Sequence, residues 1–224
     1  MDRFFCFLAF WFFLAGCAGG GVGDGGVVGD GGGAGVPQEL AAEAGHFASL
    51  EERAAAALAV ARREGLREDC CLLLDYAMPS GEPRLMVWSF EEGRVVACTF
   101  AMHGPGPEPG GPQGSTKEHA LLGQELGSRC SAEGLMALTH EHGTRVRRSY
   151  RLRGLEERTR NVWDRGLMVH AAPWMDMQCF KEYVPLHERS CEGCVTLTGP
   201  GMALMEELME GQEGELLLWA FEGR

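Results

Sequence analysis

Apolar residues beyond Asp69 come in short runs that Gly, Pro and Ser interrupt. Runs of about four to eight residues with this punctuation are typical of β-strands, because helices need longer periodic segments. The phrase "SFEEGRVV" places Glu92 and Gly93 between two such runs and predicts a hairpin. The predicted strands are Cys71–Leu74, Arg84–Phe90, Val95–Met102, Leu135–Thr139, Tyr150–Leu152, Leu167–His170, Val195–Thr198 and Leu216–Phe221.

Two segments follow a helical pattern instead. Residues 38–67 are rich in Ala and Glu; Ser49 is placed to cap a helix, Glu52 to complete a capping box, and Gly65 follows the basic end of the segment. The second predicted helix is Gly201–Glu210, whose apolar face is typical of a core helix and consists of Met202, Met205, Leu208 and Met209. The sequence pattern therefore predicts a mainly β (α+β) domain with a few flanking helices.

The N-terminus has the pattern of a bacterial lipoprotein signal. Arg3 precedes the apolar run Phe4–Leu14, which is shorter than the roughly 20 residues of a transmembrane helix and fits a signal peptide. The following "LAGC" resembles a lipobox, so we expect residues 1–16 to be removed and Cys17 to be lipidated. A plain secretory signal is the alternative. Because Ala18 rather than Asp follows the cysteine, we expect a periplasmic protein anchored to the outer membrane.

Residues 17–37 read almost entirely as glycine, valine and alanine, with two isolated aspartates. Such a composition cannot bury apolar surface and is typical of a flexible tether. The expected organisation is therefore a signal peptide at 1–16, a tether at 17–37, a helical segment at 38–67 and one domain at 68–222.

Composition narrows the classes of function. The formal net charge of −12 argues against nucleic-acid binding, which needs clustered Lys and Arg. The chain has nine cysteines, but their scattered positions argue against a small disulfide scaffold. Membrane contact is expected only through the lipid at Cys17.

The pair Cys191 and Cys194, in "RSCEGCVTLTGPG", carries the most chemistry. Zinc needs about four ligands, and no second C-x-x-C is present. A thioredoxin-like pair opens a helix, whereas "CVTL" predicts a strand. A disulfide between the two is a third interpretation. In the fourth, Cys194 is a nucleophile and Gly193 lets the backbone turn so that nearby amides form an oxyanion hole.

A thiol nucleophile needs a base. The phrase "RGLMVHAAPW" places His170 at the end of an apolar strand, followed by the small residues Ala171 and Ala172. A sheet would hold the imidazole, and the small neighbours leave space beside it. The spacing alone favours a structural histidine over a catalytic one.

A resemblance to a known family favours the catalytic interpretation of His170 over the structural one. Five phrases, in order from about Leu72 to Phe221, resemble the YkuD-type murein L,D-transpeptidase catalytic domain. They are "LLLDYAMPSGEPRLMVWSFEEGRVV", "FAMHGPG", "LGSRCSAEG", "YRLRGLEERTRNVWDRGLMVHAAPWM" and "CEGCVTL". Each phrase is weak by itself, and their common order makes the resemblance strong.

The resemblance implies a YkuD-like β-sandwich that acts on peptidoglycan stem peptides without a cofactor or metal. Cys194 would attack the third residue of a tetrapeptide stem, release D-alanine and form a thioester, which an amine or water resolves. His170 would be its base, and the Gly193 region would supply the oxyanion hole. The implied substrate-binding residues are His103, Cys191, Ser128 and Arg165, although we favour a structural role for Arg165.

The chain also departs from the family pattern. Cys191 stands where Ser or Thr is usual, so it could form a disulfide with Cys194. Ala171 stands where glycine is usual, and Leu122-Gly123-Gln124 replaces a Phe-Ser-Asn phrase. The alternative to an active enzyme is an inactive or metal-binding envelope lipoprotein that binds peptidoglycan.

Overall fold

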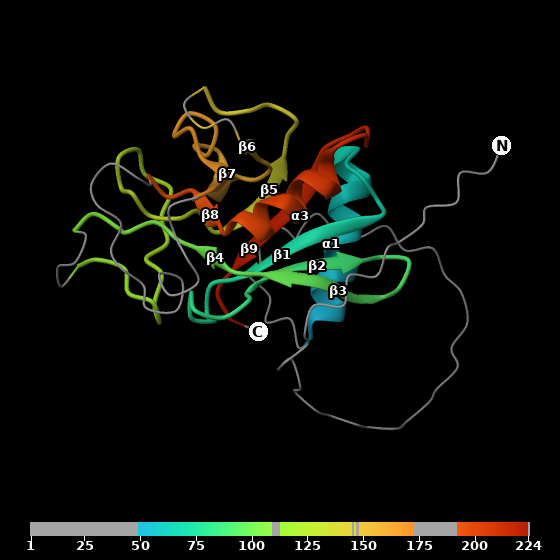
Figure 1. The fold of residues 1–224 in the computed structure, drawn as a ribbon, viewed down its shortest axis with the longest axis horizontal. Helices are drawn as coiled ribbons and strands as arrows, with labels where there is room; N and C mark the ends of the chain where they lie inside the picture. The colour runs from blue at the N-terminus through green and yellow to red at the C-terminus, as the bar shows by residue number, and fades with distance from the viewer. Residues whose placement is uncertain (1–48, 109–112, 145, 147, 173–191, 224) are drawn as a thin grey trace. The chain divides into compact units, whose positions relative to one another are not determined.

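A computed structural model describes residues 49–108, 113–144, 146, 148–172 and 192–223 (Figure 1). The chain divides into two compact units, Met1–Gln38 and Glu39–Arg224, and every described residue belongs to the second. The expected signal peptide, Cys17 and the tether lie outside the described residues and stay predictions. No helix in the described ranges is long and apolar enough to cross a membrane.

The described residues form a nine-stranded sheet in the order β3-β2-β1-β9-β5-β6-β7-β8-β4. The pairs β1–β9 and β7–β8 are parallel, and the other neighbours are antiparallel. Each predicted strand overlaps an observed one, so the mainly β prediction is confirmed. The strands are β1 Cys70–Asp75, β2 Leu85–Ser89, β3 Arg94–Thr99, β4 Ala101–Met102, β5 Gly134–Leu138, β6 Ser149–Gly154, β7 Met168–Ala171, β8 Val195–Leu197 and β9 Leu216–Phe221.

The two ends of the sheet order are close in sequence. Strand β3 pairs with β2 at one end, β4 pairs with β8 at the other, and only Phe100 separates β3 from β4. One residue spans only about 3.4 Å. The sheet must therefore curve until its ends meet, and the enclosed side holds the main core.

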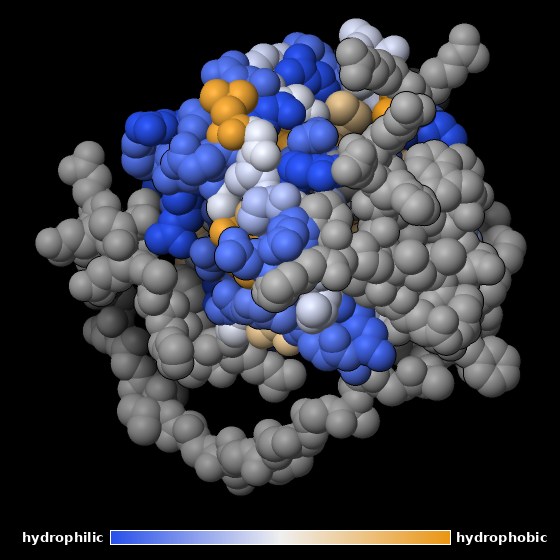
Figure 2. Space-filling model, turned by 90° about the vertical axis from the view of Figure 1, so that its left-hand side faces the viewer, coloured by the Kyte–Doolittle hydropathy of each residue, from blue (hydrophilic) through white to orange (hydrophobic). Residues whose placement is uncertain are grey.

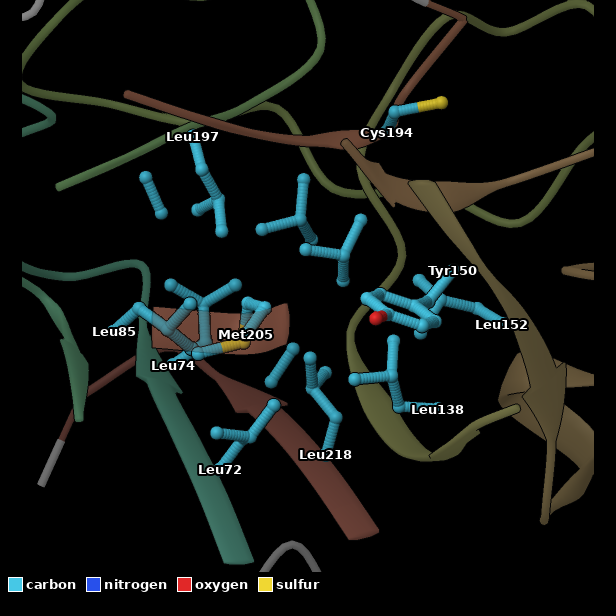
Figure 3. Close-up of a cluster of buried hydrophobic side chains, with 14 of the residues drawn as sticks. Leu72, Leu74, Leu85, Leu138, Tyr150, Leu152, Cys194, Leu197, Met205 and Leu218 are labelled. Atoms are coloured by element: carbon cyan, nitrogen blue, oxygen red, sulfur yellow. The ribbon is translucent and has the colours of Figure 1, made fainter. Parts of the chain in front are cut away.

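Side chains alternate between the two faces of the central strands. Leu72 and Leu74 of β1 belong to the inner core, whereas Cys71 and Leu73 belong to a second, outer cluster. This alternation follows from the two-residue period of a strand. Figure 3 shows part of the inner core, where Leu72, Leu74 and Leu218 surround Met205.

Two helices cover these faces, and a 3-10 turn, η2 (Glu157–Thr159), follows β6. Helix α3 (Gly199–Met209) buries Met202, Met205 and Met209 in the inner core, as its apolar face predicted. Helix α1 (Leu50–Glu64) packs alanines on the outer cluster.

The ends of α1 are those that the sequence predicted. The Ser49 hydroxyl accepts a hydrogen bond from the Glu52 amide at 3.2 Å, which satisfies one free donor of the first turn. Gly65 ends the helix in the left-handed conformation, at φ 68°.

Candidate active site

The candidate catalytic residues lie on the parallel pair β7–β8. His170 on β7 is the register partner of Thr196 on β8, and Cys194 directly precedes β8. Val195 and Leu197 belong to the inner core, so Thr196 between them points to the opposite face, whereas Cys194, just before the strand, is itself a member of the inner-core cluster. Figure 3 shows the Cys194 sulfur directed away from the labelled leucines. His170 lies on the face of Thr196, because its strand neighbours Val169 and Ala171 belong to the inner core.

The register also limits the separation of Cys194 and His170. Cys194 lies two residues before Thr196, the partner of His170. With a rise of about 3.3 Å per residue and a strand spacing of about 4.8 Å, their Cα atoms are roughly 8 Å apart. The fold therefore places the predicted nucleophile and the predicted base on neighbouring strands, and both are buried, at 7% and 4% exposure.

Hydrogen bonds define the tautomer of His170. Its Nδ1 lies 3.0 Å from the carbonyl oxygen of Ala171. A carbonyl only accepts, so Nδ1 carries the proton and Nε2 of the neutral ring keeps a free electron pair. The Thr196 hydroxyl lies 3.3 Å from that Nε2 and can donate to it. The imidazole is thus arranged to accept a proton at Nε2.

Glycine is required at position 193. Its φ is +111°, where an L side chain is strained. A Cβ there would lie 2.1 Å from the Cys130 carbonyl oxygen and 2.8 Å from Nη2 of Arg165. The turn before Cys194 is therefore packed tightly against the segment around Cys130.

Ser131 connects this turn to a second glycine. Its hydroxyl accepts from the Gly104 amide at 2.8 Å and donates to the Gly193 carbonyl at 3.2 Å, and its side chain is completely buried. A Cβ on Gly104 would lie 2.8 Å from the Gly193 Cα. Ser131 occurs in the phrase "LGSRCSAEG", but the sequence assigned no role to it.

Arg165 contacts backbone rather than open space. It donates to the carbonyl oxygens of Gly123 at 2.7 Å, Cys130 at 2.5 Å and Glu192 at 3.2 Å. These bonds tie the nucleophile turn to the segment at 123–130. They favour the structural role over the substrate carboxylate contact that was also expected.

His103 differs from its prediction. We expected it to line the cleft, but its side chain is completely buried, and its Nδ1 accepts from Nη2 of Arg84 at 2.6 Å inside the domain. Burial, followed by the charge of Arg84, lowers the pKa of His103 to about 3. The buried side chain of His103 therefore has no surface for contact with a substrate in this structure. His103 directly precedes Gly104 in the sequence.

Arg84 was missed by the sequence interpretation. It is completely buried and also donates to the carbonyl oxygens of Ala101 and Met78, both at 2.9 Å. Burial lowers the pKa of this guanidinium to about 10. A strand-initial arginine in "EPRLMVW" gives no sign of burial, and the only available signal was its place in the family phrase.

The other predicted site residues are more peripheral or lie outside the described ranges. The Ser128 hydroxyl accepts from the Cys130 amide at 3.4 Å, a local turn contact. Cys191 lies outside the described residues, so its pairing stays a prediction. Cys70, Cys71 and Cys130 are free thiols. Within the described ranges, no three His, Cys, Asp or Glu residues gather as a metal site.

The residue types of the candidate site indicate a class of enzyme. A cysteine and a histidine whose Nε2 can accept a proton, placed on neighbouring strands, are the residue types that thiol-dependent acyl transfer needs. The sequence matches the family model described as the L,D-transpeptidase catalytic domain over residues 43–221. The match covers most of the chain and includes Cys194, His170 and Ser131. The chain therefore belongs to the L,D-transpeptidase catalytic domain family.

A comparison with solved structures finds similarity to the L,D-transpeptidase from Xylanimonas cellulosilytica DSM 15894. The identity is 15%, the TM-score is 0.34, and the match covers 73% of this chain and 68% of that chain. At this TM-score the similarity adds nothing to the family assignment, which rests on the family model. None of the curated proteins matches the chain.

Proposed function

We propose that this protein is a peptidoglycan L,D-transpeptidase that uses Cys194 as its nucleophile. The observation that carries the proposal is the hydrogen bond from Nδ1 of His170 to the Ala171 carbonyl, because it leaves Nε2 as the proton acceptor, on the strand next to the one that Cys194 precedes. Family membership supports the reaction class and a peptidoglycan substrate.

In the first half-reaction, the Cys194 thiol gives its proton to Nε2 of His170. The thiolate then attacks the carbonyl carbon of the third residue of a tetrapeptide stem. The amides of Gly193 and Cys194 would stabilise the resulting oxyanion. The imidazolium returns its proton to the amine of D-alanine as the C–N bond breaks, which leaves a thioester on Cys194. Acid–base assistance of this kind contributes about 10²–10⁴-fold to the rate.

In the second half-reaction, an acceptor amine attacks the thioester and His170 takes its proton. The C–S bond breaks and the Cys194 thiolate is regenerated. An amine from the third residue of a neighbouring stem gives a cross-link between two third-position residues. A lipoprotein amine or water would give attachment or carboxypeptidase activity from the same intermediate.

The test is D-alanine release from purified tetrapeptide muropeptides. Cys194→Ala should abolish release while the fold is retained, and Cys191→Ser should preserve or increase it. Cys98→Ala, on β3, is the matched control for loss of a thiol. Equal loss from the Cys194 and Cys191 changes would contradict the proposal and favour a paired role, such as metal binding.

We also propose that the protein acts in the periplasm from a lipid anchor at Cys17. The proposal rests on "LAGC" after a short apolar run and on the glycine-rich segment that follows. Metabolic labelling with a fatty acid should mark the wild-type chain and spare Cys17→Ala. Labelling of both would contradict the assignment.

A further inference from the structure

We infer that Ser131 is a positioning residue that orients the peptide between Gly193 and Cys194 as an oxyanion donor. The inference rests on the proposed function, because it concerns the same thiol. Ser131 lies 62 positions before Gly193 in the sequence, yet its Oγ contacts the Gly193 carbonyl.

The direction of both hydrogen bonds at Ser131 follows from chemistry. The Gly104 amide can only donate, so the Ser131 oxygen must accept from it at 2.8 Å. The Gly193 carbonyl can only accept, so the hydroxyl proton must point to it, at 3.2 Å. No water is needed to complete this arrangement, and the hydroxyl proton has one defined direction.

A fixed carbonyl fixes the rest of its peptide unit. In a trans peptide, the C=O and the N–H point in opposite directions, and the described chain has no cis peptide bond. Because Ser131 holds the Gly193 oxygen on the buried side, the Cys194 N–H points away from that side. An oxyanion donor must be oriented before the charge forms, because reorientation during the reaction costs energy.

Close packing restricts the alternative orientation. A Cβ on Gly104 would lie 2.1 Å from the Arg129 carbonyl oxygen and 2.8 Å from the Gly193 Cα, so Gly104 fits between these two backbones only as glycine. Arg129 has a φ of 59°, in the left-handed region, which is uncommon for a residue other than glycine. The backbone around Ser131 is thus shaped to bring its hydroxyl to Gly193.

The experiment compares two reactions of the same thiol in the full chain. p-Nitrophenyl acetate acylates a thiol through a tetrahedral oxyanion, whereas iodoacetamide alkylates it by displacement and forms no oxyanion. Mass spectrometry of peptides measures both rates at Cys194. Loss of an oxyanion donor costs about 10²–10³-fold. A misoriented donor should cost less than a lost one. We therefore expect Ser131→Ala to lower the ratio of the acylation rate to the alkylation rate by about tenfold or more.

Ser115→Ala is the matched control. Ser115 is also buried, and its hydroxyl accepts from the Leu121 amide at 3.0 Å, whereas the hydroxyl of Ser131 bonds Gly104 and Gly193. The ratio should stay within about twofold of wild type. Ser131→Cys serves if the alanine variant does not fold, because a thiol is nearly the same shape and a weak donor. Its ratio should lie between those of wild type and Ser131→Ala.

An unchanged ratio in a folded Ser131 variant would overturn the inference, and so would an equal fall in Ser115→Ala. If the wild-type chain releases no D-alanine but the ratio falls in Ser131→Ala, the proposed function fails and the positioning role stands. If Cys194 of the wild type reacts with neither reagent, both proposals fail.

Discussion

Nε2 of His170 lies 3.3 Å from the Thr196 hydroxyl, and these two residues are register partners on β7 and β8. The contact places the proton-accepting atom of the imidazole beside β8, at the residue two positions after Cys194. The strands β7 and β8, more than twenty residues apart in the sequence, thus bring the segments of His170 and Cys194 next to each other. The Ala171 carbonyl, on the same strand as His170, orients the imidazole ring.

His170→Gln should lower D-alanine release by about 10²–10⁴-fold, because the amide cannot accept the thiol proton as a base. Thr196→Val is the matched variant on the neighbouring strand. It removes the hydroxyl that contacts Nε2 but leaves the base, so its loss should be below about tenfold. Steady-state release of D-alanine measures both. Equal losses would contradict the assignment of His170 as the base.

Gly193→Ala should destabilise the domain and stop turnover. Its Cβ would lie 2.1 Å from the Cys130 carbonyl oxygen, and the backbone is at φ +111°. Strain of this kind costs about 1–3 kcal/mol, and the steric overlap adds to it.

Gly199→Ala is the control for that change, since Gly199 begins α3 and a Cβ there meets nothing within 4 Å. Its free energy of unfolding should be unchanged or higher, by up to about 1 kcal/mol. Chemical denaturation measures both variants. A Gly193→Ala protein as stable as wild type would show that the turn is not packed as described.

Arg165→Lys should lower kcat and thermal stability with little change in KM. The guanidinium donates to three backbone carbonyls, and an ammonium cannot reproduce that planar geometry. The expected pattern separates the structural role from the substrate role. A rise in KM with unchanged stability would instead indicate that Arg165 binds a substrate carboxylate.

The burial of His103 predicts a pH-dependent stability. Its pKa is lowered from 6.5 to about 3 in the folded protein, so the unfolded chain binds an extra proton between these values. This contribution to stability is fully present above about pH 6.5 and is lost as the pH falls toward 3. One proton accounts for a slope of up to about 1.4 kcal/mol per pH unit.

His103→Gln tests this account, because glutamine keeps polar groups beside Arg84 but cannot take up the proton. The variant should be less stable at neutral pH, and its free energy of unfolding should fall less steeply between pH 6 and pH 4. Urea denaturation at several pH values gives both slopes. Identical slopes would show that His103 is protonated in the folded protein.

The strands were predictable from the sequence because each is a short apolar run between breakers. The first helix was predictable from its Ala- and Glu-rich composition and its capping residues, and the second from an apolar face that repeats with helical period. The roles of Cys194 and His170 came from the resemblance, since spacing alone favoured a structural histidine. Ser131 and Arg84 were missed because their hydrogen bonds join segments far apart in sequence. His103 was expected in the cleft because no local pattern reveals its buried arginine partner.

The most direct measurement is mass spectrometry of the intact protein and its peptides after incubation with a carbapenem, an acyl donor for this family. The account predicts one covalent adduct, located on Cys194, which is absent in Cys194→Ala and forms at least tenfold more slowly in His170→Gln. An adduct on another cysteine, or none on a folded wild-type chain kept under reducing conditions, would contradict the central claim.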